Sequence, residues 1–432
     1  MEQSNYYHLL QRAAFGPALG QEVMKKKQDK VVDALMASAV GIKPLEFPPP
    51  KGVGEMMMMG SAEQKKELQK AAREAVMKLN VQWMRQMRDP DLMVREKAVL
   101  FWHGHFATVD RNRPDFAASM NNTLREYALG DFKSLVLAVS REPAMLRFLN
   151  NQQNKASHPN ENFARELMEL FTLGQGHYSE QDIKAVARSF TGWGFDREQE
   201  FKFRQKWHDQ GEKTIFGQSG NFGGEEVIDL ILEQERCAYF ITEKICRYYV
   251  CPNPEVHQIQ YFADTLYQDQ YHIGRLLSRI FKSDWFYEQK GRLIKSPVEL
   301  LVGIGDIFDY QFKNEKAAVA LQRKMGQVLF SPPNVAGWPG DRHWIDSNTM
   351  AIRMNLPFAL WSGKGGKKEK QERVQKERVN SKWEGEDLET LSAILLRKPL
   401  TPASREILSK MLSNNPAIVL PAMMALPEFQ LA

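Results

Sequence analysis

The sequence predicts a mainly α fold, consisting of a multi-helix globular core with a small β-hairpin insertion and a C-terminal helical unit. Apolar residues recur at helical spacing over most of the chain, and alternation of apolar and polar residues is confined to residues 200–217. There is no βαβ alternation and no internal repeat of fixed period. These observations argue against a Rossmann fold, a barrel enzyme and a solenoid.

The first helices are expected between residue 1 and about residue 45, and residues 44–59, with their prolines and methionines, are expected to form a surface loop. Further helices are expected at residues 62–87, 91–103, 121–130, 132–140, 161–173, 179–190, 225–249, 256–281 and 297–308. The clearest start signal is Ser179, which can cap a helix with Asp182 at the capping-box position. Phe201 and Phe203 alternate with polar residues, and a turn at residues 209–211 precedes a second extended segment, so a β-hairpin is predicted there.

Three regions are expected along the chain. Residues 1–362 form the helical core, and residues 363–383 are a highly charged linker or exposed helix. Residues 384–432 form a C-terminal helical unit that packs on the core, because apolar spacing returns at Leu388 and Leu391.

Composition restricts the class of protein. Of 432 residues, 43% are hydrophobic and 26% are charged, which is ordinary globular usage. The net charge of +5 is spread along the chain, so we expect no nucleic-acid partner. No apolar stretch reaches the roughly 20 residues needed to cross a bilayer, so no membrane span is expected.

The three cysteines bear on the compartment. Cys237, Cys246 and Cys251 are odd in number and lack metal-site spacing, so buried free thiols are expected. The first 25 residues contain no classical export signal. Both observations favour a cytoplasmic location, and the alternative is export with a partner or from a longer precursor.

Two motifs carry histidines. His103 and His105 lie at the end of an apolar helix, where they point roughly 200° apart, so they can chelate one ion only if the helix ends at Gly104. Otherwise one histidine faces a polar cavity and the other packs among aromatic rings. His208, Asp209 and Lys213 lie on the predicted hairpin, where they suit metal ligation, anion contact or an ordinary exposed turn.

Two other motifs combine charge or aromatic rings. Glu161, Arg165 and Glu169 share the polar face of one helix, either as a surface ion-pair ladder or, in a cavity, as metal ligands or acid/base groups. The Pro/Gly-rich loop 332–340, which contains Asn334 and Trp338, is followed by Trp344. These tryptophans either cover the helices or offer a stacking surface to a ligand such as a sugar.

These motifs and several others occur in one order, at residues 12–16, 101–108, 160–174, 187–193, 208–217, 296–299, 325–338 and 426–430. Together they resemble the bacterial domain-of-unknown-function family 1800 over nearly the whole chain. The resemblance implies a large, mostly helical bacterial protein without an established activity. It also implies a possible partner, because genes of this family often lie beside those of family 1501, whose members look like alkaline phosphatases or sulfatases.

Two functional hypotheses follow. The first is a metal-dependent hydrolase of a polymeric or phosphorylated/sulfated substrate, with a divalent metal held by some of six residues: His103, His105, Glu161, Glu166, His208 and Asp209. A spare carboxylate, Glu161 or Glu166, would take a proton, and Arg165 or Lys213 would hold an anionic group. The alternative is a non-catalytic partner or chaperone-like subunit of the phosphatase/sulfatase-like neighbour, binding through the loop of Trp338 and Trp344 and through residues 56–59.

Overall fold

The structure is a computed structural model that describes residues 1–16, 21–47, 61–110, 112–312, 314–362, 383 and 386–432. The protein is 63% helical, and strands in the described residues form only two small antiparallel sheets of two strands each. The mainly α fold is therefore confirmed. Residues 48–59 of the expected surface loop and residues 363–382 of the charged segment lie outside the described residues, and residues 44–47 have no regular secondary structure.

The N-terminal half begins with the described α-helices α1 (Gln3–Ala13), α2 (Gln21–Met24), α3 (Gln28–Ser38), α5 (Ala62–Gln86), α6 (Met93–His105), α7 (Pro114–Tyr127), α8 (Phe132–Arg141) and α9 (Pro143–Phe148). After a 3-10 turn, η1 (Asn151–Gln153), helix α10 (Asn162–Glu166) continues directly as a π-helical segment, η2 (Leu167–Thr172). Helix α11 (Glu180–Ser189) begins with the predicted capping box of Ser179 and Asp182.

The second half continues with α12 (Gly224–Leu232), α13 (Glu235–Tyr249), α14 (Val256–Gln268), α15 (Ile273–Lys282), α16 (Asp284–Glu288), α17 (Pro297–Ile307), α18 (Glu315–Met325) and α19 (Ser347–Trp361). A 3-10 turn, η4 (Asp341–Trp344), precedes α19. The C-terminal unit consists of α20 (Leu388–Leu395), α21 (Pro402–Asn414), η5 (Pro416–Ile418), α22 (Val419–Met424) and η6 (Pro427–Gln430).

The strands differ from the prediction in their pairing. Strand β2 (Phe201–Phe203) pairs with β1 (Trp193–Phe195), and β3 (Lys213–Ile215) pairs with β4 (Gln218–Gly220). Residues 209–211 therefore do not join two paired strands, and a 3-10 turn, η3 (Gln205–Trp207), lies between β2 and β3. Each predicted extended segment pairs with the strand nearest to it in sequence, because a short connection costs the least entropy to close.

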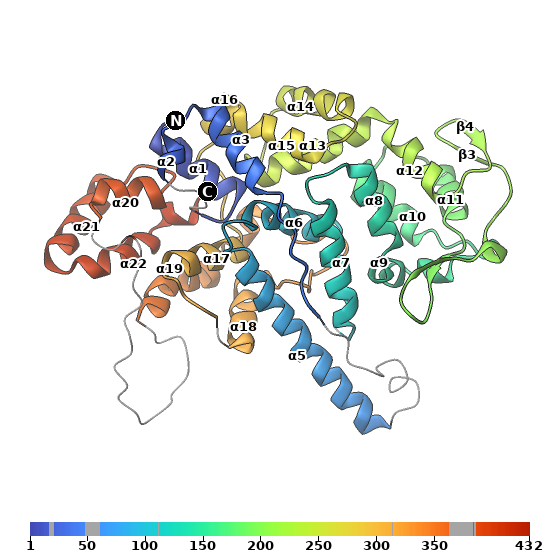
Figure 1. Cartoon of the computed structure of the whole chain (residues 1–432), viewed down its shortest axis with the longest axis horizontal. Coiled ribbons are helices and arrows are strands. Elements are labelled where there is room, and N and C mark those ends of the chain that lie inside the picture. Colours follow the sequence, from blue (N-terminus) through green and yellow to red (C-terminus); the bar gives the residue numbers. More distant parts are fainter. Residues whose placement is uncertain (17–20, 48–60, 111, 313, 363–382, 384–385) are drawn as a thin grey trace.

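Helix α6 crosses the middle of the molecule (Figure 1) and is buried along its whole length except at Gly104. Trp102 is fully buried, stacks between Phe106 and Phe132, and donates a hydrogen bond to the carbonyl of Ala128. A helix that is buried on every side is surrounded by neighbouring elements. Its last turn is therefore held firmly among the surrounding helices.

The C-terminal unit lies beside α1, so the two ends of the described chain are close together (Figure 1). Residues 291–295 form backbone hydrogen bonds with residues 430–432, including Lys295 N to Gln430 O at 2.9 Å and Ala432 N to Leu293 O at 2.8 Å. These bonds join the C-terminal unit to the segment that leads into α17.

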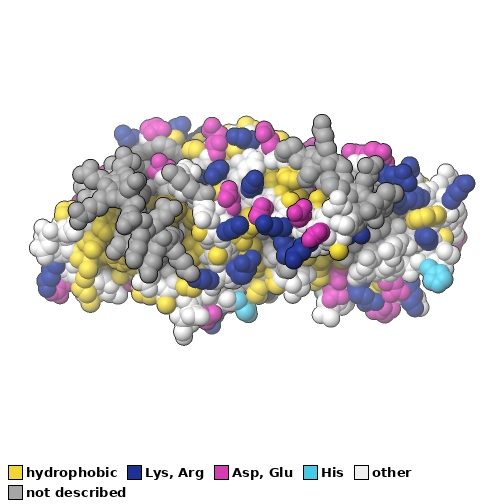
Figure 2. Space-filling model, turned by 90° about the horizontal axis from the view of Figure 1, so that it is seen from below, with side chains coloured by type: hydrophobic (Ala, Val, Ile, Leu, Met, Phe, Trp, Pro, Cys, Tyr) yellow, Lys and Arg dark blue, Asp and Glu magenta, His cyan; other side chains and the backbone are white. Residues whose placement is uncertain are grey.

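The state of the cysteines and the distribution of charge on the surface are those of an ordinary globular protein. Cys237, Cys246 and Cys251 are buried and free, as expected. On the face shown in Figure 2, basic side chains gather near the middle, with acidic side chains among them. No helix within the described ranges is both long enough and apolar enough to span a membrane.

Candidate ligand-binding cleft

Motif residues that are far apart in the sequence meet in one cleft of about 320 Å³. Its walls come from α1, the end of α6, the second half of α13, the start of α17 and the loop before η4. The residues that line it are Arg12, Leu100, Phe101, Gly104, His105, Lys244, Arg247, Tyr248, Pro252, Leu293, Ile294, Ser296, Glu299, Gln327, Ala336, Trp338, Pro339, Gly340, Asp341 and Trp344. Aromatic rings and cationic side chains therefore surround the same space.

The two histidines of α6 do not form a chelate, because the helix continues through Gly104 to His105. His103 points away from His105, as two residues of a helix separated by roughly 200° must. Its Nε2 accepts a hydrogen bond from the backbone N–H of Phe330 at 3.0 Å, and its ring packs against Trp83. Burial lowers the pKa of His103 to about 3, so this side chain is a neutral part of the core.

His105 has a free acceptor at the cleft. Its Nε2 lies 3.0 Å from the carbonyl oxygen of Phe171, and a carbonyl oxygen only accepts, so the proton is on Nε2. Its Nδ1 then carries a lone pair and is buried without a hydrogen-bond partner. Burial and, secondarily, the charge of Lys244 hold the pKa of His105 well below its usual range. The ring is therefore a neutral acceptor in the cleft wall.

The segment from Asn162 to Thr172 does not line the cleft, but carbonyl groups at its C-terminal end bind side chains that do. The last carbonyl groups of a helix have no partner within it and carry its negative dipole end. Here the carbonyl of Leu170 accepts from Lys244 at 3.2 Å, that of Phe171 from His105, and that of Leu173 from Arg236 at 3.0 Å. This helix therefore positions two of the side chains that line the cleft.

A buried ion-pair cluster forms the floor. Glu299 bonds to Lys97 through Oε1, and Arg12 Nη1 lies 3.5 Å from the same oxygen. Oε2 of Glu299 accepts from the backbone N–H of Ser296 at 2.7 Å in a capping box that starts α17. Burial would raise the pKa of Glu299, but Lys97 and Arg12 outweigh burial and lower it to about 2. Burial lowers the pKa of Lys97 to about 8, against the opposing effect of Glu299.

Two further polar atoms at the floor and wall make no hydrogen bond, although one of them, Arg12 Nη1, forms the ion pair with Glu299. The hydroxyl of Tyr248 is buried and makes no hydrogen bond, while its ring lies 5.2 Å from that of Phe101. Arg12 donates from Nε to the carbonyl of Tyr249 at 3.0 Å and from Nη2 to that of Tyr248, but Nη1 donates no hydrogen bond. Buried polar groups are normally satisfied, so these atoms indicate a place for ligand or water.

The loop before η4 forms the opposite wall. Trp338 is half-buried with its ring 5.6 Å from that of His103, and Trp344 is buried. Gly337 has a φ of 76°, and a Cβ there would overlap the carbonyl oxygen of Gly104. Glycine thus lets the loop lie directly on the end of α6. Asn334 is exposed, accepts from the backbone N–H of Ala336 within the loop, and does not line the cleft.

The predicted residues Glu161 and Arg165 form ion pairs that are open to water. Arg165 bridges Glu161 and Glu180 at 3.4 and 2.8 Å, and the three side chains are 37%, 37% and 67% exposed in that order. This is the surface ladder that the spacing of Glu161 and Arg165 allowed. Burial, and then the nearby charge of Glu169, raise the pKa of Glu166.

The hairpin residues form a structural network. Asp209 accepts two hydrogen bonds from Arg188, at 2.7 and 3.0 Å, and these bonds lower the pKa of Asp209 against the opposing effect of burial. Lys213 is buried and donates to the carbonyls of Asp209 and Gly211. His208 Nδ1 lies 2.9 Å from the carbonyl of Thr191. These contacts hold the loop between β2 and β3 in place.

The structure therefore does not bring the predicted metal ligands together. No group of three or more His, Cys, Asp or Glu side chains able to hold a metal occurs in the part of the chain that the structure describes. Trp338, Trp344 and His105 line the cleft, whereas Glu161, Arg165, Glu166, His208, Asp209 and Lys213 do not.

The residues of the cleft and its floor that reasoning from the sequence missed include Arg12, Lys97, Lys244, Arg247, Tyr248 and Glu299. Arg12 and Glu299 belong to the motifs 12–16 and 296–299, so the signal for them was a charged residue inside a motif. Lys97 and Lys244 each lie in a helix among apolar residues, and nothing in their spacing sets them apart.

The fold and the cleft define an α-helical protein with one aromatic and cationic cleft assembled from separate sequence motifs. The chain belongs to the family described as Protein of unknown function (DUF1800), whose family model matches residues 8–431. The match confirms the resemblance that the motifs carried. Comparison with curated proteins and with solved structures gives no match.

Proposed function

We propose that this protein binds, in the cleft beneath Trp338, an anionic ligand that contains a ring, such as a phosphorylated or sulfated sugar. The observation that carries the proposal is the combination of aromatic walls, cationic side chains and unpartnered polar atoms around one space of about 320 Å³. Ligand sites typically combine an apolar surface with a few polar groups that fix orientation.

The aromatic component is formed by Trp338, Trp344 and Tyr248. Trp338 is half-buried and belongs to a loop clamped on α6, so its ring has a defined position before any ligand arrives. A rigid aromatic surface costs little entropy when a flat or ring-shaped group packs on it.

The charged component selects an anion. Lys244, Arg247 and Arg12 line the cleft, and Asp341 and Glu299 are the acidic residues that do so. Glu299 is already paired with Lys97 and Arg12, so the cleft keeps an excess of positive charge. Phosphate, sulfate and carboxylate groups are the usual partners of such side chains.

The unpartnered atoms suit hydroxyl groups. The Tyr248 hydroxyl can donate and Nδ1 of His105 can accept, whereas Arg12 Nη1 already forms an ion pair with Glu299. A ligand hydroxyl both donates and accepts, so it can satisfy His105 and Tyr248 together. This pattern favours a polyhydroxylated anion over a simple aromatic acid.

The proposal concerns binding. The metal-dependent hydrolase hypothesis relied on histidines and carboxylates that the structure places apart. The partner hypothesis relied on the loop of Trp338 and Trp344, of which Trp338 is half-buried and Trp344 is buried, and on residues 56–59, which lie outside the described residues. Neither of these hypotheses therefore gains a supporting observation comparable to that for ligand binding.

The test is a thermal-shift screen of the purified protein against matched neutral, phosphorylated and sulfated sugars, repeated with Lys244→Met. A matched control is Lys155→Met, because Lys155 lies over an aromatic ring, that of Trp207, as Lys244 lies over that of Phe240, but does not line the cleft. We expect stabilisation by at least one anionic sugar and not by its neutral counterpart. The shift should be lost in Lys244→Met and retained in Lys155→Met, and the reverse pattern would contradict the proposal.

A further inference from the structure

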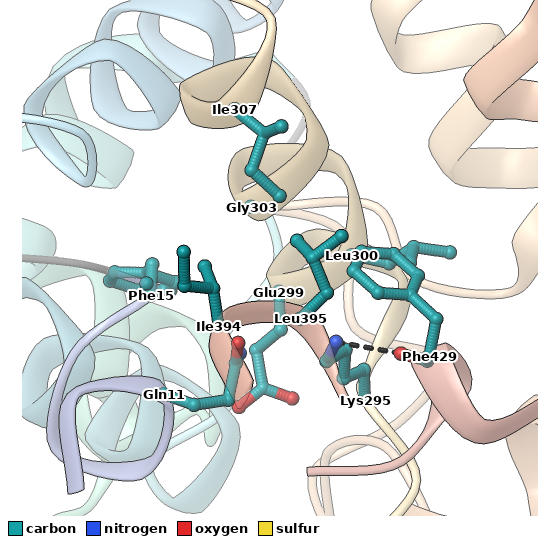
Figure 3. A pocket seen from close by; sticks show the side chains of 11 residues that line it. Gln11, Phe15, Lys295, Glu299, Leu300, Gly303, Ile307, Ile394, Leu395 and Phe429 are labelled. Carbon is teal, nitrogen blue, oxygen red and sulfur yellow. Dashed lines mark hydrogen bonds between the residues drawn. The ribbon is translucent and has the colours of Figure 1, made fainter. Parts of the chain in front are cut away.

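A second enclosed space lies behind the floor of the cleft, where the C-terminal unit meets the core. This chamber is lined by Gln11, Phe15, Gly16, Lys295, Glu299, Leu300, Gly303, Ile307, Ile394, Leu395 and Phe429 (Figure 3). Its volume is about 20 Å³, enough for one water-sized or chloride-sized guest. Gln11, Glu299 and Lys295 lie along one side, and Ile307 points in from the other.

Buried charge around the chamber is strongly unbalanced. Five buried cationic residues, Arg12, Lys97, Lys295, Arg353 and Arg397, surround one buried carboxylate, that of Glu299. Burial is the largest cause that lowers the pKa of Lys295; the next largest effects are the charges of Arg397, Glu299, Arg353 and Lys97, and three of these four groups are cations. A buried charge is stable only with a counter-charge and hydrogen bonds.

Neutral contacts satisfy only part of this cluster. Lys295 Nζ donates to the carbonyl of Phe429 at 2.6 Å, and Arg353 donates to the carbonyl of Lys295 at 2.9 Å. Arg397 donates to the carbonyls of Ala393 and Ile394. None of these bonds supplies a negative charge.

Several donors near the chamber remain free. Nε2 of Gln11, Nε of Arg353 and Nε of Arg397 are buried and have no hydrogen-bond partner. Gln11 lines the chamber directly and is more than nine-tenths buried. Every one of these unpartnered atoms is a donor, so the guest they suit is an acceptor.

We propose that this chamber is a binding site for a small inorganic anion of chloride size, held by Lys295 and Gln11. The carboxylate of Glu299 also reaches the chamber, but Lys97 and Arg12 both face it, so these three groups together remain positive. The anion supplies the missing counter-charge and joins α1 and the start of α17 to α20 and Phe429. It thereby stabilises the attachment of the C-terminal unit to the core.

The test compares thermal unfolding of the full chain in sodium chloride and in sodium gluconate at equal ionic strength. Gluconate is too large for a chamber of about 20 Å³, and equal ionic strength keeps general screening constant. We expect the unfolding midpoint to rise with chloride concentration and to saturate, with a gain of a few degrees over gluconate. Identical midpoints in the two salts would overturn the proposal.

Two variants and a control locate the effect. Lys295→Met and Gln11→Leu each remove one proposed contact, so the chloride-dependent gain should disappear in the first and shrink in the second. Lys290→Met is the matched control, because Lys290 lies near the same unit but bonds to Ser4 and Asn5 and does not line the chamber. A chloride gain that persists in Gln11→Leu at full size, or that disappears in Lys290→Met, would contradict the site. Gln11→Leu keeps the test decisive if Lys295→Met does not fold.

Discussion

Two regions of this protein carry charged residues of the same types and differ in what surrounds them. At the cleft floor, Lys97 and Arg12 both pair with Glu299, and the three side chains are 0–4% exposed. On α10, Arg165 pairs with Glu161 and Glu180, which are 37% and 67% exposed. Both regions lie in family-like motifs, yet only the first borders the cleft.

The difference teaches that spacing identifies a charged face but does not say what covers it. The i, i+4 spacing of Glu161 and Arg165 indicated a ladder of ion pairs on the surface. Because these side chains remain in contact with water, each ion pair adds little to the free energy of unfolding. The floor is assembled from residues of α1, α6 and α17. These residues are more than 80 positions apart in the sequence, so no local sequence pattern identifies the floor. Its ions have lost their water and depend on one another.

The largest expected effect comes from disrupting the buried ion-pair cluster at the floor of the cleft. Glu299→Gln removes the carboxylate and leaves Lys97 and Arg12 without a counter-charge in the interior. We expect the free energy of unfolding, measured by urea denaturation, to fall by about 3–5 kcal/mol. Glu161→Gln is the matched control and should cost less than about 0.5 kcal/mol. Equal losses in the two variants would remove the contrast between the regions.

The next effect concerns the close contact between the loop 332–340, which contains Trp338, and the end of α6. Gly337→Ala places a Cβ where the carbonyl of Gly104 lies, at a φ of 76° that disfavours any side chain. We expect a loss of about 1–3 kcal/mol beyond that of Gly326→Ala. Gly326 has a φ of 93° and open space around it, so this control isolates the overlap from backbone strain. Urea denaturation of both variants measures the difference.

The pH dependence of stability tests whether the buried histidines are neutral in the folded state. Burial, the largest cause in each case, lowers the pKa values of His8, His103 and His105 in the folded state, so the unfolded chain binds more protons below about pH 6.5. Stability should therefore fall as the pH falls below 6.5, by about 1.4 kcal/mol per pH unit for each histidine. His103→Gln should reduce this slope between pH 6.5 and 5, and an unchanged slope would contradict a neutral buried His103.

A smaller effect sharpens the assignment of the cleft. Tyr248→Phe removes one unpartnered hydroxyl and keeps the ring against Phe101. We expect a sugar anion found in the screen to bind about tenfold more weakly, a change of about 1.4 kcal/mol. The free energy of unfolding should change little, because the hydroxyl makes no bond within the protein. Titration calorimetry and urea denaturation measure the two quantities.

The smallest effect is expected on the surface ladder. Arg165→Ala breaks ion pairs with Glu161 and Glu180 that are open to water. We expect a loss of less than about 0.5 kcal/mol in urea denaturation and no change in ligand binding. A loss above about 2 kcal/mol would show that exposure is a poor guide to the strength of these pairs.

The fold was largely predictable because helix signals are local. The capping box at Ser179, the long helix near residues 62–87 and the apolar stripe of α6 all act within a few residues. The strand pairing was harder, because Phe201–Phe203 and Lys213–Ile215 each had more than one possible partner. The continuation of α6 to His105 was also missed, since Gly104 reads as a stop but is tolerated inside a helix.

The candidate site was only partly predictable. Trp338 and Trp344 stood out because large rings on a Pro/Gly-rich loop need cover or a ligand, and both line the cleft. Tyr248 and Lys244 did not stand out, because a helix with polar residues on one side is ordinary. Only the packing of α13 against the end of η2 turns those residues toward α6.

The most direct test of the account is a calorimetric titration of the anionic sugar that gives the largest thermal shift, carried out on the wild type, Trp338→Ala and Trp207→Ala. Both substitutions remove a half-buried tryptophan, but only Trp338 lines the cleft. The account predicts that Trp338→Ala weakens binding at least tenfold, by about 1.4 kcal/mol or more, while Trp207→Ala binds as the wild type does. Unchanged binding in Trp338→Ala, or an equal loss in Trp207→Ala, would contradict a ligand site beneath Trp338.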